Sequence, residues 1–103
     1  MIPLPRLRDI RYEKDARDSV DIACNQWARA EDQIALLEWA IVRDPREGEA
    51  MTESGVVRSL TLPGAQSIGA PTVTFVYEIV DDNCIAIHSA RFEDAKAEPQ
   101  TRH

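Results

Sequence analysis

The hydrophobic pattern changes its period once, at the Asp44-Pro45 dipeptide, and this change constrains the fold more than any other feature. Before it, apolar residues recur every three or four positions, as on one face of a helix: Val20, Ala23/Cys24, Trp27, Ala30, Ile34, Leu37 and Ile41. Pro45 ends this half because proline cannot continue the helical hydrogen bonds. From Val56 onward apolar and polar residues alternate, which is typical of half-buried strands. The sequence therefore predicts an α+β fold.

The helical half is too long for one helix in a chain of 103 residues. An unbroken helix from Asp15 to Val42 would extend about 40 Å at 1.5 Å per residue. Trp27 and Trp39 would lie roughly 120° apart on it. We therefore expect a hairpin of two helices, with Asp15 as the first N-cap and a break near Ala30-Glu31-Asp32.

The extended half contains three predicted strands, at residues 56–62, 72–80 and 84–91, and a fourth at residues 8–12 precedes the helices. The last two should form a hairpin, because only Asp81-Asp82-Asn83 separates them. We expect the N-terminal helical hairpin to pack across one face of an antiparallel sheet of about four strands. Residues 1–94 then form one domain, whose first residues with Pro3 and Pro5 make an irregular arm. Residues 95–103 have little to bury and should form a mobile tail.

Composition excludes several classes of function. The formal net charge is -6, and residues 15–53 carry four arginines against ten acids, which opposes broad binding to a phosphate backbone. No apolar run approaches the roughly 20 residues of a membrane span, so we expect a cytoplasmic protein. Cys24 and Cys84 then indicate free thiols. Ligand spacings for a metal and glycine loops for a nucleotide cofactor are lacking, so neither is expected.

Two arginines are the candidate catalytic residues. Arg58 and Arg91 are the only cations between Arg46 and Lys96, and each lies in a predicted strand. On one exposed face of the sheet, their guanidinium groups would hold a phosphodiester and stabilise the charge formed when it is cleaved. The alternative is that each pairs with a nearby acid such as Glu78 or Glu93. His88 is expected to be a packed or surface imidazole.

The order of these elements resembles the RelE/ParE family of toxins from type II toxin-antitoxin systems. The resemblance covers about residues 8–93 and consists of patterns of apolar spacing. The matching residues are Ala16, Asp44-Pro45-Arg46-Glu47-Gly48, Val57-Arg58-Ser59-Leu60, Val76-Tyr77-Glu78-Ile79-Val80-Asp81-Asp82 and residues 85–91. The resemblance implies a growth-inhibiting bacterial toxin whose partner is a cognate antitoxin. The antitoxin has a disordered C-terminal segment, which folds along the toxin when the two bind.

Two targets follow from the resemblance. RelE-like members are endoribonucleases that cut messenger RNA on the ribosome with a basic cluster, to which Arg58 and Arg91 correspond. The cluster is incomplete here, because Thr74 stands where the family commonly has arginine and no tyrosine follows Tyr77. ParE-like members act on DNA gyrase by protein contact, which needs no basic sheet. The alternative function is that of a non-toxic fold relative acting as a protein-binding module.

Overall fold

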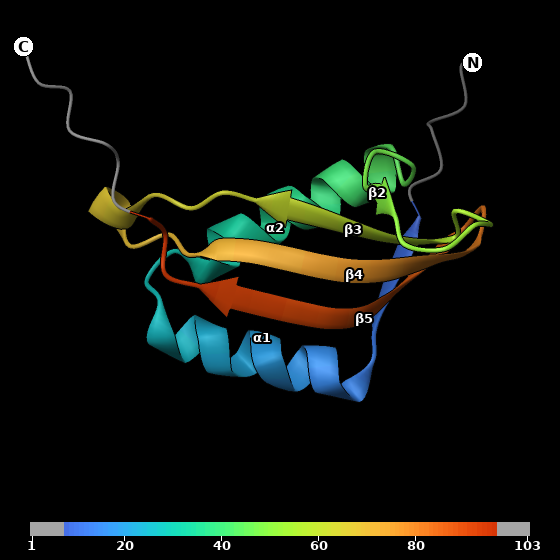
Figure 1. Cartoon of the computed structure of the whole chain (residues 1–103). Helices are drawn as coiled ribbons and strands as arrows, with labels where there is room; N and C mark the ends of the chain where they lie inside the picture. Colours follow the sequence, from blue (N-terminus) through green and yellow to red (C-terminus); the bar gives the residue numbers. More distant parts are fainter. Residues whose placement is uncertain (1–7, 97–103) are drawn as a thin grey trace, which may run out of the picture.

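The computed structural model of the chain describes residues 8–96, shown in Figure 1. Its elements in chain order are β1 (Asp9–Tyr12), α1 (Lys14–Gln26), α2 (Ala30–Arg43), β2 (Glu49–Ala50), β3 (Val57–Leu62), the short 3-10 helix η1 (Gln66–Ile68), β4 (Thr72–Asp81) and β5 (Cys84–Glu93). The prediction of an α+β fold is confirmed. The predicted arm with Pro3 and Pro5, and residues 97–103 of the predicted tail, lie outside the described residues.

The sheet differs from the predicted one in two respects. It has five strands in the order β1-β5-β4-β3-β2, not four. The added strand β2 has only two residues, and so short a segment shows no alternation in the sequence. The sheet is also mixed rather than antiparallel, because β1 pairs parallel with β5. Strand direction in that pair depends on two segments about 70 residues apart, which a local pattern does not record.

The helical hairpin has the predicted form with shifted boundaries. α1 ends at Gln26 and α2 begins at Ala30, so the break precedes the expected one by a few residues. Glu13, not Asp15, is the N-cap residue of α1. α2 ends at Arg43, directly before Asp44-Pro45, as the proline requires.

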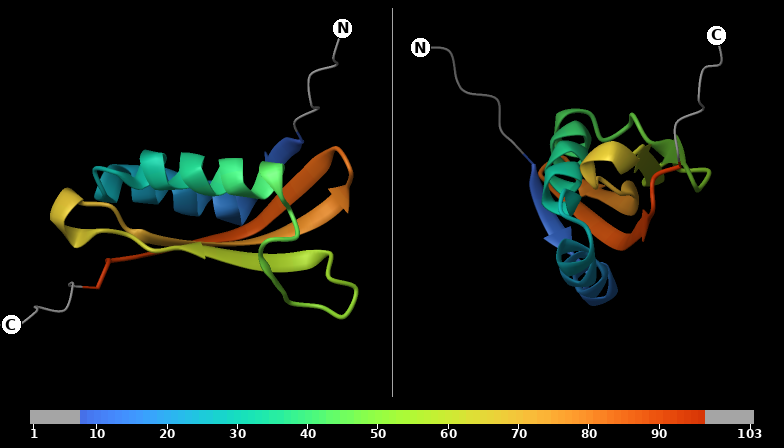
Figure 2. Two further views of the ribbon diagram at one scale, coloured as in Figure 1. Left: turned by 90° about the horizontal axis from the view of Figure 1, so that it is seen from above. Right: turned by 90° about the vertical axis from the view of Figure 1, so that its left-hand side faces the viewer.

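The core lies between the helices and one face of the sheet. Figure 2 shows both helices on the same side of the strands, and within residues 8–96 no helix covers the other side. Strand β4 supplies Val73, Phe75 and Tyr77, each fully buried, at alternate positions. The other large buried side chains are Leu37 and Ile41 of α2 and Ile85 and Ile87 of β5. Full burial of a side chain of this size contributes about 1.5–3 kcal/mol to folding.

The loop between β3 and β4 is attached to α2 through a buried amide. Gln33 is 7% exposed, and its Nε2 donates to the carbonyl oxygens of Pro63 at 3.1 Å and Pro71 at 2.9 Å. An isolated bridge between Ala65 and Ala70 closes the loop around η1. The loop therefore has a fixed position at one end of the sheet.

Two further findings concern the limits of the domain. Ala95, the first residue of the predicted tail, is 8% exposed, so the packed part of the chain extends past β5. Neither α1 nor α2 is both long enough and apolar enough to cross a membrane.

Candidate functional site

Arg58 is bound to backbone carbonyl groups of its own domain. It lies on β3 opposite the buried Tyr77, so its side chain is on the helix side of the sheet. Its Nε donates to the carbonyl of Gly55 at 2.7 Å, and its Nη1 donates to those of Gly48 at 2.7 Å and Arg46 at 2.9 Å. The guanidinium therefore holds the segment between α2 and β3 in place.

Arg91 lies on the other face of the sheet. It lies on β5 opposite Thr74 of β4, so both side chains are on the same face of the sheet. Thr74 alternates with the buried Val73 and Phe75, and this face is therefore the one away from the helices. The Nε of Arg91 forms an ion pair with Glu93 at 3.0 Å, and the side chain is 74% exposed. The structure thus separates the two candidate arginines by the thickness of the sheet. The expected partner Glu93 is confirmed for Arg91, whereas Arg58 uses carbonyl groups instead of an acid.

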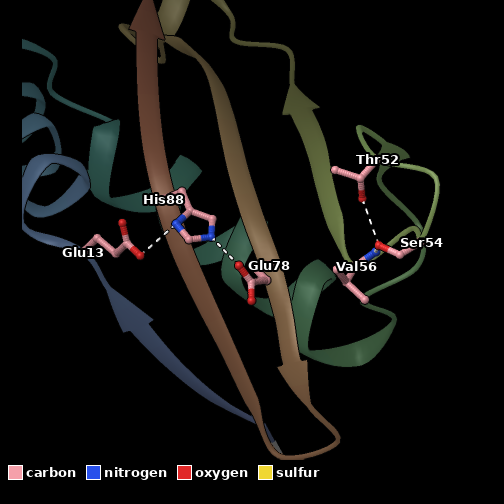
Figure 3. Close-up of polar contacts among 6 residues, drawn as sticks. All are labelled: Glu13, Thr52, Ser54, Val56, Glu78 and His88. Atoms are coloured by element: carbon pink, nitrogen blue, oxygen red, sulfur yellow. Dashed lines mark hydrogen bonds and ion pairs between the residues drawn. The ribbon is translucent and has the colours of Figure 1, made fainter.

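His88 forms a cluster with two carboxylates that the sequence did not predict. His88 is the extra residue of a β-bulge in β5, where the register shifts between Val76 and Tyr77 of β4. Figure 3 shows its ring between two acids: Nδ1 lies 2.8 Å from Glu13 and Nε2 lies 2.9 Å from Glu78. The bulge turns the ring toward both, and the cluster connects the start of α1 to β4 and β5.

The acids on either side favour the protonated ring. Hydrogen bonds that the ring donates to Glu13 first, and then to Glu78, raise the pKa of His88 above its ordinary value of 6.5. An imidazolium that donates from both nitrogens has no lone pair for a proton or a metal ion. Residues 8–96 also contain no group of three or more metal-ligating side chains. Because the His88 cluster joins the start of α1 to β4 and β5, we call it the His88 clamp.

The clamp should make stability depend on pH near neutrality. Because the folded-state pKa of His88 is raised, its contribution is complete below pH 6.5 and is lost as the pH rises through the folded-state value. We expect a loss of less than about 1 kcal/mol between pH 6 and pH 8, since the ring is partly exposed. Urea unfolding at both pH values measures it. His88→Gln should remove the difference, and an unchanged difference in that variant would assign it to other groups.

A shallow apolar groove lies where α1 passes beside β5, and we call it the α1–β5 groove. It has a volume of about 230 Å³ and is lined by Ser19, Ile22, Ala23, Gln26, Trp27, Ala90, Arg91 and Phe92. Trp27 stacks on Phe92 with ring centroids 6.2 Å apart, and its Nε1 donates to Asp94 at 2.9 Å. Ile22 is 64% exposed at the rim. The groove therefore offers fixed aromatic rings and an exposed aliphatic side chain.

Within residues 8–96, the backbone edge of β5 beside this groove is not paired with a strand. Strand β1 pairs with β5 only as far as Ile87, where the chain turns into α1 after a last hydrogen bond from Glu13 N to Ile87 O. From Ser89 to Glu93, none of the described strands pairs with β5 on that side. Sequence reasoning missed this site. The sequence feature that could have indicated it is Ile22, a large aliphatic residue outside the predicted apolar stripe of the helix.

A second groove lies between the two helices and surrounds a cysteine. It is about 580 Å³ in volume, and its lining includes Cys24, Asp21, Glu31 and Glu38. Burial first, and then the charges of Glu31 and Asp21, raise the pKa of the Cys24 thiol. A raised pKa disfavours the thiolate, so the groove does not suit nucleophilic catalysis.

The scan against family models matched none, and the searches of curated proteins and of solved structures found no significant match.

Proposed function

We propose that this chain is the toxin-like component of a type II toxin-antitoxin system, neutralised by a cognate antitoxin and acting, when free, on DNA gyrase or on translation. The observation that carries the proposal is the unpaired edge of β5 beside the α1–β5 groove. The element order and matched segments of the RelE/ParE resemblance support it.

The edge and the groove together fit an extended peptide. The N–H and C=O groups on this edge of β5, which no described strand pairs, would bind the backbone of an added strand, and the groove would take one of its apolar side chains. A disordered antitoxin segment supplies such a strand, because it orders only on binding and covers the exposed apolar surface. Ile22 and the stacked Trp27 and Phe92 would be its main side-chain contacts.

Action by protein contact has more support than cleavage of messenger RNA. Arg58 and Arg91 lie on opposite faces of the sheet, so one phosphodiester would not touch both. Around Arg91 the open face carries hydroxyl groups: Thr74, in the position of the family's arginine, shares a hydrogen bond of 2.8 Å with Thr61. The separation of Arg58 and Arg91 onto opposite faces favours a gyrase-type contact. It equally favours the alternative, a non-toxic protein-binding module.

The test is expression of the full chain alone and together with the product of its neighbouring gene. We expect growth inhibition by the chain alone and a stable complex with restored growth in co-expression. Ile22→Asp should weaken the complex about tenfold or more, because it places a charge against an apolar partner surface. Met51→Asp, at a site 57% exposed after β2, is the matched control and should bind normally. Normal growth with no complex would contradict the proposal, whereas a complex without toxicity would favour the binding module.

Arg91→Ala separates the two mechanisms. If the toxin acts by contact with gyrase, the variant should inhibit growth within about twofold of the parent chain, since an exposed ion pair contributes little. Growth assays with mapping of transcript ends measure both effects. Loss of toxicity together with loss of cut transcripts would instead assign Arg91 to a nuclease site.

A further inference from the structure

Helix α2 is apolar on nearly all sides, although only one side is buried. Between Ile34 and Val42, Glu38 is the only polar residue. Ile34, Leu37 and Ile41 face the core, whereas Leu36 is 54% exposed and Trp39 is 58% exposed. A helix with this composition usually has its outer side covered as well. Figure 2 shows α2 on one face of the sheet.

Four residues form the exposed stripe that we call the α2 outer face: Asp32, Leu36, Trp39 and Arg43. At 100° per residue they lie within about 60° of one another, opposite the buried residues of α2. The Arg43 guanidinium lies 4.7 Å from the centroid of the Trp39 ring. A guanidinium stacked in this way keeps its N–H edge available to an acceptor. Among the ion pairs of residues 8–96 none involves Arg43, and Asp32, paired with Arg29 at 3.1 Å, is 63% exposed.

The spacing of the α2 outer face is the same in both directions. Its residues are separated by four, three and four positions, with an acid at one end, a base at the other and two large apolar residues between them. Two such helices related by a two-fold axis near Leu37 and Glu38 place Leu36 of each copy against Trp39 of the other. The same axis places Asp32 of each copy against Arg43 of the other. The stripe is thus complementary to itself in shape and charge.

We propose that two copies of this chain associate through antiparallel contact of their α2 outer faces. The inference does not depend on the proposed function, because the α1–β5 groove lies elsewhere. One helix pair buries less than the roughly 800 Å² per partner of a standard interface. We therefore expect a weak dimer, with a dissociation constant of about 10 μM to 1 mM.

Sedimentation equilibrium of the full chain up to about 1 mM tests the dimer in that range. Trp39→Ala should raise the dissociation constant about 30-fold, as expected for a central aromatic anchor. The fold should be kept because Trp39 is exposed. Met51→Ala, at a similarly exposed site outside the α2 outer face, should leave the dissociation constant unchanged. A monomer at all concentrations, or a dimer insensitive to Trp39→Ala, would overturn the proposal. So would a chain that is monomeric alone but binds its neighbour's product through Trp39.

Charge reversal tests the antiparallel arrangement itself. Asp32→Arg places two arginines together at each end of the interface, and Arg43→Asp places two acids there, so each variant alone should dimerise about tenfold more weakly. A mixture of the two restores opposite charges at both ends, and a heterodimer should form in preference to either homodimer. Fluorescence anisotropy of one labelled variant, titrated with the other, measures this preference. Equal affinities in all three pairings would exclude the antiparallel register.

Discussion

Replacing Arg58 by lysine should lower the free energy of unfolding by about 2–3 kcal/mol, although the positive charge is kept. The guanidinium donates to three carbonyl groups, of Gly55, Gly48 and Arg46, at 2.7 to 2.9 Å. A lysine ammonium has a different geometry and would leave carbonyl groups without donors. For a domain of this size the loss corresponds to a fall of about 10–20 °C in Tm. Urea unfolding followed by circular dichroism measures it.

The stability of Arg58→Lys distinguishes a structural role of Arg58 from a catalytic one. Arg91→Lys is the matched control, because Arg91 is exposed and should tolerate the change within about 0.5 kcal/mol. If Arg58→Lys is as stable as the parent chain but loses transcript cleavage, Arg58 is a catalytic residue and the structural interpretation is wrong. Any loss of toxicity in an unstable Arg58 variant must therefore be compared with its folded fraction.

Gly64→Ala should be the most damaging single-methyl change in the β3–β4 loop, at about 3 kcal/mol. A Cβ atom built on Gly64 would overlap the carbonyl oxygen of Ala70 and the carbonyl carbon of Pro71. Both are backbone atoms, so the turn would have to open and give up the hydrogen bond from Gly64 N to the Thr72 hydroxyl. Thermal unfolding measures the effect.

Gly69 in the same loop is the control, because it is required for a different reason. Its φ is +70°, and a Cβ atom there would meet only Ala28 at an ordinary 3.7 Å. Gly69→Ala should cost about 1 kcal/mol from backbone strain, and Gly69→Asn less, since asparagine tolerates the left-handed region. If Gly64→Ala proves no worse than Gly69→Ala, the close approach of the two loop segments is wrong.

Local patterns were sufficient to predict most of the secondary structure. The alternation of apolar and polar residues predicted β4 almost in full, and Asp44-Pro45 predicted the end of α2 at Arg43. The strand order and the parallel pairing of β1 were not predicted, because they depend on contacts between distant segments. β2 was missed because Glu49 and Ala50 owe their strand conformation to pairing with β3.

The site was less predictable than the fold. Arg58 and Arg91 were identified as the two sheet cations, but the faces they occupy depend on register and on the bulge at His88. The partners of Arg58 are carbonyl groups, which no side-chain pattern records. The α1–β5 groove arises because β1 stops pairing at Ile87, and that is a property of the assembled sheet.

The position of β5 has a consequence for synthesis of the chain. Among the described strands β5, which ends at Glu93, lies between β1 and β4, so β1 has no neighbour in the sheet until β5 has been made. Pairing of two strands that lie far apart in the sequence slows folding, and the strand groups of β1 stay exposed until that pairing forms. A nascent chain stopped before β5 should therefore be more sensitive to protease than one extended past Glu93. Until β5 has been made, a chaperone can reach strand groups that the finished sheet pairs.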